Sequence, residues 1–558
     1  MKRLYLLDLL ALAATLAFAG CGKDDQTSDP APSEPGLVIE QTDYTLDAVE
    51  GRTATVSFTA SADWTLTVKY NEDETDSNWL TAEPANGSAG EQTVELSARV
   101  HTGVEARTAY VEIACKEQSV QLTVTQTAVS DDTDFTGLFD PEFAKVLQEE
   151  EIISDAEHIT REDMAKVAEV SELYVYAQSM TSLQGIEYFE SLTTLICTMN
   201  QLTSLDLSKN TALTTLYCNY NPLKSLDLSK NTALTELNCS ENQLTSLDLS
   251  QNTKLTMLNC SENQLKSLDV NDCTALMELY CDSNQLESLD VNGCTALTQL
   301  DCNDNQLTEL DVNSCTALTR LHCTMNQLTS LDVSQNTALT GLSCTMNQLT
   351  SLDLSKNTKL MGLNCDINPL KSLDLSQNTA LTQLTCSENQ LESLDLSQNT
   401  ALTELNCYNN LLESLDLSKN TALTILACDN NQLTSLDLSQ NTALTQLSCN
   451  NNQLESLDLS QNTALTGLSC SMNQLESLDL SPNTALTMLY CNSNLLTSMD
   501  ISKNTALNIF ICHDNPGDGS TFRVTTWDDL DIPMLFTKDD WVFNGQTISI
   551  LYQNATGE

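Results

Sequence analysis

Sixteen cysteines of this chain recur every 21 residues, from Cys197 to Cys512. Asparagines from Asn200 to Asn515 and aspartates from Asp206 to Asp500 keep the same period. A fixed period over more than half of a protein indicates a solenoid, because each repeat buries its apolar side only against its neighbours. The sequence therefore predicts a long stack of short coils.

Each repeat contains one short strand. Alternation at Leu216, Tyr217 and Cys218 predicts that leucine and cysteine point inward and tyrosine points outward. Stacked strands lie about 4.8 Å apart, so like residues should stack on like residues. We expect Asn221 and its equivalents to turn inward and bond to turn backbone, since buried polar groups need partners.

The repeat also identifies a family. The unit that begins at Leu213 matches the pattern LxxLxLxxNxL, and its second half, from Leu223, matches it again. From Leu192 to Asn515 the chain therefore resembles the nested 21-residue class of leucine-rich repeats, called the IRREKO type. Leu173 to Leu192 resembles the entry repeat of internalin-like proteins. The resemblance implies that the strands line a concave side, which commonly binds other proteins.

The cysteines admit three interpretations. Stacked thiols are small apolar groups that suit a narrow core, and this is the favoured one. Disulfides would need adjacent Cβ atoms about 1 Å closer than stacked strands place them. Metal binding needs ligands that converge from several directions, and no CxxC pair exists here, so we expect no metal. Cys273, Cys294 and Cys315 replace a second column of asparagines, either by drift in a duplicated block or as exposed thiols.

The N-terminus reads as a targeting segment. Lys2 and Arg3 precede an apolar run that ends in Phe18-Ala19-Gly20-Cys21. Residues 1–21 resemble a bacterial lipoprotein signal, which implies a lipid on Cys21, although an ordinary signal peptide remains the alternative. Lys23, Asp24 and Asp25 resemble the export signal of Bacteroidetes surface lipoproteins. The resemblance implies an outer-membrane protein exposed at the cell surface, which touches the membrane only through its anchor.

Two segments lie between this signal and the repeats. Residues 22–36 are polar and proline-rich and read as a tether. Residues 37–128 contain alternating runs separated by turn residues such as Asn86-Gly87, which predicts an antiparallel sandwich. The runs are Thr53–Phe58, Trp64–Val68, Gln92–Ala98, Thr108–Ala114 and Ser119–Thr125.

The same segment resembles a second family. Ser61-Ala62-Asp63-Trp64, Trp79-Leu80 and the closing run Leu122–Gln126 resemble a BACON domain, which is immunoglobulin-like. The resemblance implies either a carbohydrate role or a spacer role. Trp64 and Trp79 could stack on sugars, but both lie in apolar strand patterns, so core packing is favoured.

The remaining segments complete the predicted architecture. Residues 129–172 should form a linker and a helical cap, with helices starting at Pro141 and after Thr160. Residues 173–515 form the solenoid, and residues 516–558 its C-terminal cap. The predicted fold is mainly β: an immunoglobulin-like β-sandwich, then a leucine-rich-repeat solenoid with a small helical N-terminal cap.

Charge restricts the partners. The chain has 77 acidic and 24 basic residues, a formal net charge of −53. This disfavours nucleic acid, whose phosphates need a basic surface. Asp206 and its equivalents form an outward column, stabilised either by local hydrogen bonds or by condensed cations.

Variation among the repeats suggests where a ligand binds. The Leu-Asp-Leu-Ser half barely changes, whereas the outward positions around the strand differ from repeat to repeat. Aromatic side chains carry interface energy at low entropic cost. The candidate ligand-binding residues are therefore Tyr217, Tyr220, Tyr280, Asp301, His322, Tyr408 and Tyr490.

These features favour a lipid-anchored surface protein that recognises an extracellular protein or glycoprotein through its strands. A glycan-binding accessory and an acidic spacer without a ligand are the alternatives. We expect no catalytic activity and no cofactor, because GxSxG, HExxH, P-loop and GxGxxG motifs are absent from the sequence.

Overall fold

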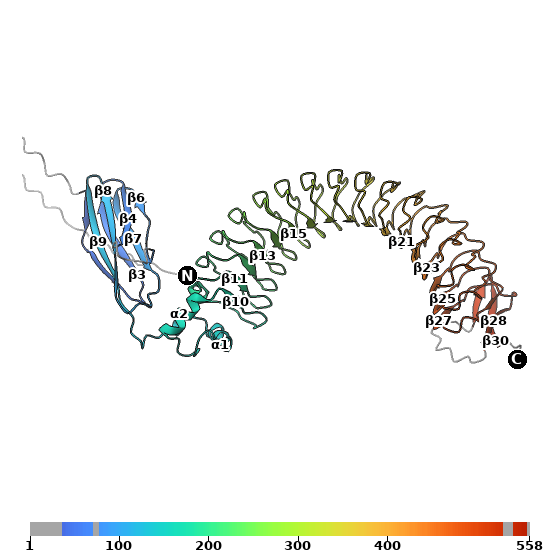
Figure 1. The fold of residues 1–558 in the computed structure, drawn as a ribbon, viewed down its shortest axis with the longest axis horizontal. Coiled ribbons are helices and arrows are strands. Elements are labelled where there is room, and N and C mark those ends of the chain that lie inside the picture. The colour runs from blue at the N-terminus through green and yellow to red at the C-terminus, as the bar shows by residue number, and fades with distance from the viewer. Residues whose placement is uncertain (1–35, 71–77, 528–539, 555–558) are drawn as a thin grey trace, which may run out of the picture. The chain divides into compact units, whose positions relative to one another are not determined.

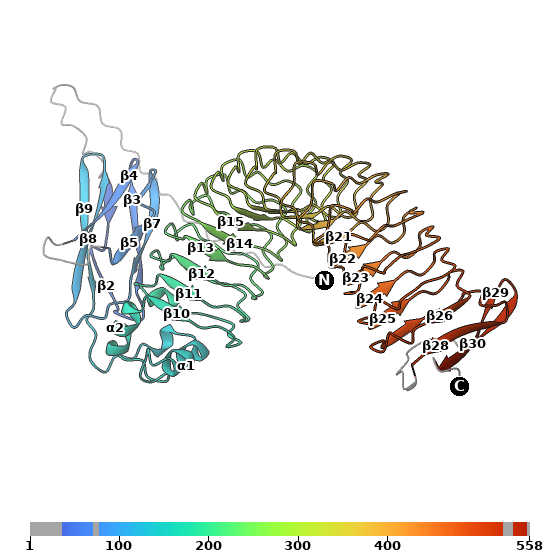
Figure 2. The same cartoon turned by 45° about the vertical axis from the view of Figure 1, so that its right-hand side comes forward.

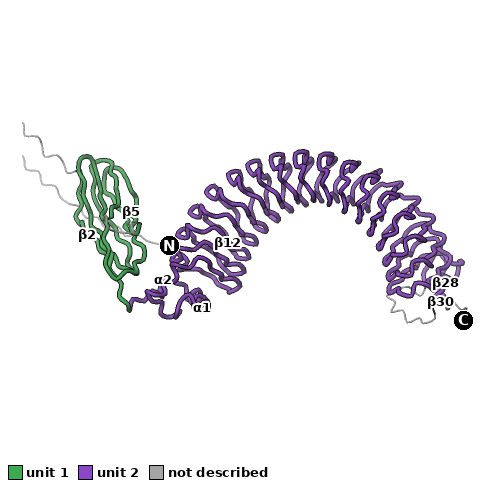
Figure 3. Tube along the Cα trace, viewed as in Figure 1, with its two compact units in different colours: residues 1–131 green, residues 132–558 purple. Residues whose placement is uncertain are grey.

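The computed structural model describes residues 36–70, 78–527 and 540–554. The chain divides into two compact units, residues 1–131 and 132–558 (Figure 3). Cys21, Lys23, Asp24 and Asp25 lie outside the described residues. Within the described parts, every helix is too short or too polar to cross a bilayer.

The first unit is a sandwich of two sheets, as the alternating runs predict. The first sheet has the order β1-β3-β7-β5 and the second the order β2-β9-β8-β4-β6. All pairs are antiparallel except β2 with β9. The strands are β1 (Leu37–Ile39), β2 (Asp43–Leu46), β3 (Thr53–Ala60), β4 (Trp64–Tyr70), β5 (Leu80–Glu83), β6 (Asn86–Gly87), β7 (Gly90–Ala98), β8 (Arg107–Cys115) and β9 (Gln118–Gln126).

Both tryptophans of this unit lie in its core. Trp64 is 1% exposed and Trp79 is 0% exposed. Phe58 packs edge-on against Trp64, with ring centroids 4.8 Å apart, and the Arg107 guanidinium lies 4.6 Å above the Trp79 ring. Core packing is therefore confirmed, and the sugar-stacking alternative for these two side chains is wrong.

The prediction of a simple turn at Asn86-Gly87 is also wrong. These residues form β6, which pairs with Trp64 and Thr65 of β4. A Cβ at Gly87 would lie 2.7 Å from the Trp64 indole nitrogen, so the close approach of the two strands requires glycine. A two-residue strand is too short to give the alternation from which the sequence predicts strands.

A helical cap opens the second unit. It contains η1 (Thr136–Leu138), α1 (Pro141–Glu149), α2 (Arg161–Glu169) and, inside the entry repeat, η2 (Ile186–Tyr188). Thr160 caps α2 through a reciprocal pair of hydrogen bonds with Asp163, as the sequence predicts. The Asp163 carboxylate is fully buried and also accepts hydrogen bonds from Ser154.

The solenoid forms one parallel sheet of seventeen three-residue strands, which lines the inner side of its curve (Figures 1 and 2). Identical repeat positions pair, for example Leu216 with Leu237. The strands are β10 (Glu172–Tyr174), β11 (Thr194–Ile196), β12 (Thr215–Tyr217), β13 (Glu236–Asn238), β14 (Met257–Asn259), β15 (Glu278–Tyr280), β16 (Gln299–Asp301), β17 (Arg320–His322), β18 (Gly341–Ser343), β19 (Gly362–Asn364), β20 (Gln383–Thr385), β21 (Glu404–Asn406), β22 (Ile425–Ala427), β23 (Gln446–Ser448), β24 (Gly467–Ser469), β25 (Met488–Tyr490) and β27 (Ile509–Ile511).

A small sheet closes the C-terminal end. It has the order β26-β28-β30-β29 and consists of β26 (Ser498–Asp500), β28 (Thr521–Thr526), β29 (Asp540–Phe543) and β30 (Gln546–Asn554). Trp541 is buried against Phe522, and its indole nitrogen donates a hydrogen bond to the carbonyl of Asn515 at 2.8 Å. This contact covers the last coil of the core.

Cysteines fill the interior of the solenoid. All twenty cysteines in the described ranges are unpaired and buried. Burial raises the pKa of the Cys239 and Cys344 thiols to about 12 in both cases. Thiols with so high a pKa stay protonated and act as small apolar side chains.

The three additional cysteines are buried too, so the exposed-thiol alternative is wrong. Cys273 is 1% exposed, and Cys294 and Cys315 are 0% exposed. They occupy the second asparagine column, which points into the core. The Cys294 thiol lies 3.3 Å from the carbonyl of Val270, in the place of an asparagine amide.

The aspartates of the outward column accept hydrogen bonds from backbone N–H groups of their own turns. The Asp206 carboxylate accepts a hydrogen bond from the backbone N–H of Ser208 at 2.9 Å, and Asp227 does the same with Ser229. This bond is the main cause of a lowered pKa at Asp227. The local hydrogen bonds expected from the sequence are therefore present.

Candidate binding surface of the solenoid

The outward side chains of β10–β25 and β27 form a continuous surface, which we call the strand face. Each strand contributes its first and third residues, while the central leucine points inward and is buried; in β27 a phenylalanine replaces it. The ladder cysteine that follows each strand is buried as well, and so is Val175, which takes its place after β10. Only the outward positions are therefore free to vary without disturbing the core.

The predicted ligand-binding residues lie on or beside this face. Tyr217, Tyr280, Asp301, His322 and Tyr490 are third residues of their strands and are half-buried. Tyr408 directly follows a ladder cysteine, and Tyr220 lies in the turn two residues after one.

The structure does not bring these residues into one site. Tyr217 in β12 and Tyr490 in β25 are thirteen strands apart, which corresponds to about 60 Å of sheet. The predicted residues therefore belong to several separate groups. Tyr280, Asp301 and His322 lie on three successive strands, and of these Asp301 and His322 bond directly.

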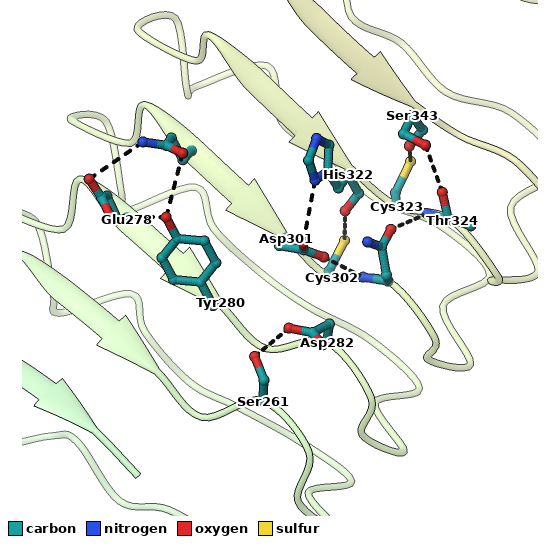
Figure 4. Close-up of polar contacts among 12 residues, drawn as sticks. Ser261, Glu278, Tyr280, Asp282, Asp301, Cys302, His322, Cys323, Thr324 and Ser343 are labelled. Atoms are coloured by element: carbon teal, nitrogen blue, oxygen red, sulfur yellow. Dashed lines mark hydrogen bonds and ion pairs between the residues drawn. The ribbon is translucent and has the colours of Figure 1, made fainter. Parts of the chain in front are cut away.

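Hydrogen bonds run from strand to strand in the middle of the face (Figure 4). The Asp301 carboxylate lies 3.3 Å from Nδ1 of His322 on the next strand. The Tyr280 hydroxyl donates to Glu278 of its own strand at 3.0 Å and lies 3.5 Å from Oε1 of Gln299 on the next strand. Thr324 and Ser343 join their hydroxyl groups at 2.8 Å. These bonds hold the outward side chains in fixed positions before any partner binds.

Tyr217 and Tyr280 are neutral hydrogen-bond donors. Burial, then the adjacent Glu278, raises the pKa of Tyr280, and burial followed by Glu236 does the same for Tyr217. The Tyr217 hydroxyl donates to Glu236 at 2.9 Å. Each such pair combines an aromatic ring with a carboxylate.

The sequence reasoning missed Tyr174 and Tyr176. They are 45% and 60% exposed, and Tyr174 pairs in register with Ile196 at the start of the face. Val175 takes the place of the ladder cysteine in this repeat, so the cysteine period does not reach them. The alternation of Leu173, Tyr174, Val175 and Tyr176 is the signal that could have found them.

The strand face offers no metal centre. Among the residues that the structure describes, no group of three or more histidine, cysteine, aspartate or glutamate side chains is arranged to hold a metal ion. The Asp301–His322 pair provides a hydrogen bond between strands. What the surface can do chemically is present aromatic, amide and carboxylate groups in a fixed array.

Comparisons with known proteins agree with both units. Residues 36–129 match the family model described as the viral BACON domain. The chain is 36% identical to the functional domain of InlJ from Listeria monocytogenes, described as including a cysteine ladder, with a TM-score of 0.57. That likeness covers 73% of this chain and 84% of the InlJ domain.

Two further solved structures have lower similarity. The internalin InlF from Listeria monocytogenes is 22% identical, with a TM-score of 0.48, over 64% of this chain and 96% of that one. The effector YopM from Yersinia pestis is 24% identical, with a TM-score of 0.42, over 60% of this chain and 86% of that one. No curated protein matches the chain. The identity and coverage with InlJ show that the chain belongs to the internalin-like leucine-rich-repeat family, with a BACON domain ahead of its repeats.

Proposed function

We propose that this protein binds an extracellular protein or glycoprotein through the strand face of its solenoid and catalyses no reaction. The observation that carries the proposal is the contrast between two columns of the same coil. The Leu-Asp-Leu-Ser half repeats almost unchanged, whereas the outward strand positions change from Tyr280 to Asp301 to His322 in successive coils. Uniform residues suit structure, and individual residues suit recognition.

The hydrogen bonds that fix side chains at the strand face support the same conclusion. Asp301 and His322 contact each other across neighbouring strands. Just beyond these strands, the backbone N–H of Thr324 donates a hydrogen bond to Oδ1 of Asn303 in the preceding coil. A partner would therefore meet side chains that lose little further entropy on binding. The likeness to InlJ, at 36% identity, places the chain among solenoids of the same type.

We also propose that the mature chain is anchored by a lipid on Cys21 and displayed outside the cell. The support is the signal-like N-terminus with the lipobox ending at Cys21, followed by Lys23, Asp24 and Asp25. Metabolic labelling with an alkyne fatty acid should mark the wild-type chain, and Cys21→Ser should remove the label. Protease treatment of intact cells should then degrade the wild-type solenoid, whereas protection in intact cells would reject display.

Glycan binding by the BACON domain has less support. Trp64 and Trp79, its two candidate stacking residues, are buried in the core. The test is a glycan array probed with the full chain. Glycan binding that persists after substitution of strand-face residues would support this alternative.

The strand-face proposal is tested by site-specific photo-crosslinking. A photo-reactive residue placed at outward strand positions should capture a partner, and the same residue on the opposite half of the coil should not. Equal capture from both sides would reject a dedicated face.

A further inference from the structure

Exposed aromatic and apolar side chains gather at the first three strands of the solenoid. Tyr174, Tyr176, Met199 and Tyr220 are 45%, 60%, 55% and 43% exposed, and Tyr217 and Ile196 are half-buried beside them. We call this group the tyrosine patch; it consists of Tyr174, Tyr176, Ile196, Met199, Tyr217 and Tyr220. So many exposed large side chains at one end of a sheet mark an interaction surface.

The register brings these side chains together. Tyr174, Ile196 and Tyr217 are the third residues of three successive strands, β10 to β12. The backbone N–H of Ala177 donates to the carbonyl of Thr198, which sets Tyr176 beside Thr198 in the next coil. Met199 and Tyr220 follow one another at the same position of the turn, with φ angles of 57° and 56°.

Three tyrosine hydroxyls of the patch bond to glutamates. Tyr174 donates to Glu172 at 2.8 Å and Tyr217 donates to Glu236 at 2.9 Å. The hydrogen bond of Tyr220 to Glu241 is the main cause of the raised pKa of that tyrosine. The hydroxyl group of each of these three tyrosines is therefore hydrogen-bonded to a glutamate. Each of the three electron-rich rings lies next to a negatively charged carboxylate.

The charged side chains at the outward positions around the patch are all acidic. At the outward strand positions of β10 to β14 and the left-handed turn positions that follow these strands, the charged residues are Glu172, Glu236, Glu241 and Glu262. The lysine that follows Tyr220 in sequence, Lys224, lies outside these positions. Glu262 has a raised pKa because of burial and of the neighbouring Glu241 and Asp282. Because these carboxylates repel one another, a bound cation would lower their electrostatic energy.

We propose that the tyrosine patch binds lysine or arginine side chains of a protein partner, each held over a tyrosine ring and against the carboxylate paired with it. A cation over an aromatic ring and a charged hydrogen bond to a carboxylate reinforce each other at one site. Tyr174 and Tyr217 are two strands apart, so two such cations would sit about 10 Å apart. This inference rests on the proposed function, since it names the chemistry of the partner that the strand face takes.

The test uses the full chain and a defined probe. The probe is the peptide acetyl-Gly-Arg-Gly-Gly-Arg-Gly-amide, and its counterpart contains citrulline, a neutral side chain of nearly the same shape. Calorimetric titration at low salt should show tighter binding of the arginine peptide. The double variant Tyr174→Leu with Tyr217→Leu should weaken that binding about five- to thirtyfold, since two ring–cation contacts are lost.

Matched variants separate this site from general attraction to an acidic protein. Tyrosine and leucine are both neutral, so the double variant keeps the net charge. Tyr174→Phe with Tyr217→Phe keeps both rings and should bind within about twofold of the wild type. Gln398→Leu with Gln461→Leu, at exposed positions on the Leu-Asp-Leu-Ser half of the coil, should leave binding unchanged. Equal melting temperatures verify that the variants fold.

Three results would overturn the inference. The first is equal binding of the arginine and citrulline peptides; the second is unchanged binding by the leucine double variant. The third is tighter binding of a neutral sugar, maltoheptaose, that is lost in the same variant, which would assign the patch to glycans. If crosslinks form along the strand face while the leucine variant keeps the peptide, the patch inference fails and the proposed function stands.

Discussion

Asn221 donates a hydrogen bond from Nδ2 to the carbonyl oxygen of Cys197, one coil earlier in the solenoid, at 3.0 Å. It donates another to Cys218 of its own coil at 3.1 Å, and its Oδ1 accepts the backbone N–H of Leu202 at 3.0 Å. One amide therefore satisfies three buried backbone groups and ties two coils together. The same arrangement recurs along the solenoid, for example at Asn347.

Removing this amide should be costly. Asn221→Ala leaves a buried N–H and two buried carbonyls with a partner missing, so we expect a loss of about 3 kcal/mol in the free energy of unfolding of the coils around it. Urea denaturation followed by circular dichroism measures the loss. Gln243→Ala, at an exposed position just after the equivalent asparagine of the next coil, is the control and should change stability by less than about 0.5 kcal/mol.

The second asparagine column should tolerate change better. Asn231 donates to the carbonyls of Leu207 and Asn210, but its buried Oδ1 contacts no donor among the described residues. Asn231→Cys removes this unsatisfied oxygen. It places a thiol at the repeat position that Cys294 holds in its own coil. We expect it to cost about 1 kcal/mol or less, whereas Asn221→Cys should cost about 3 kcal/mol. Equal losses of stability for Asn231→Cys and Asn221→Cys would contradict this difference between the two asparagine columns.

The buried thiols should make the solenoid sensitive to alkali. Burial raises the pKa of Cys344 and Cys407 from 9.0 to about 12 in the fold. Because the folded pKa exceeds the unfolded one, the unfolded chain binds fewer protons, and stability is present below pH 9 and falls as the pH rises above it. At pH 10 each such cysteine should cost about 1.4 kcal/mol of stability.

Urea midpoints between pH 8 and pH 10 measure this fall. The double variant Cys344→Ala with Cys407→Ala should start less stable at pH 8 but lose less stability on going to pH 10. Parallel curves for variant and wild type would contradict the assignment of the effect to the ladder. Iodoacetamide should leave the described cysteines of the native chain unmodified and label them after denaturation.

The turn after each ladder cysteine holds a backbone strain that can be relieved. Ile367 has a φ angle of 52°, in the left-handed region that a β-branched residue rarely adopts. Asn409, Asn430 and Asn451 occupy the same place in later coils. Because asparagine tolerates this conformation, Ile367→Asn should stabilise the solenoid by about 1 kcal/mol. A lower melting temperature of Ile367→Asn in scanning calorimetry would contradict this prediction. It would mean that the packing of the isoleucine side chain stabilises the fold by more than the backbone strain costs.

The 21-residue period was enough to predict the main architecture. It determined the strand position, the inward leucine and cysteine columns and the pairing of Leu216 with Leu237. These features follow from stacking identical units. The alternation in residues 37–128 likewise gave the long strands of the sandwich but missed short ones such as β6 and β1.

The strand face was less predictable, because its side chains bond to residues of other coils. The contact between Asp301 and His322 depends on rotamers that no pattern specifies. The left-handed turn was hidden because most coils place other residues there, such as methionine, glutamate and isoleucine, and the usual signal of asparagine is present only at Asn409, Asn430 and Asn451. Tyr174 and Tyr176 were missed because their repeat lacks the ladder cysteine.

Photo-crosslinking by position tests the central claim most directly. Benzoylphenylalanine would replace outward strand residues of four coils and, in separate chains, exposed residues on the Leu-Asp-Leu-Ser half. The strand positions are Thr215, Gln299, Gln383 and Gln446, and the matched positions are Gln251, Gln335, Gln398 and Gln461. With extracellular proteins present, we predict that a discrete adduct forms from at least one strand position and from none of the matched ones. Adducts from both sets alike, or from the matched set alone, would contradict a binding function of the strand face.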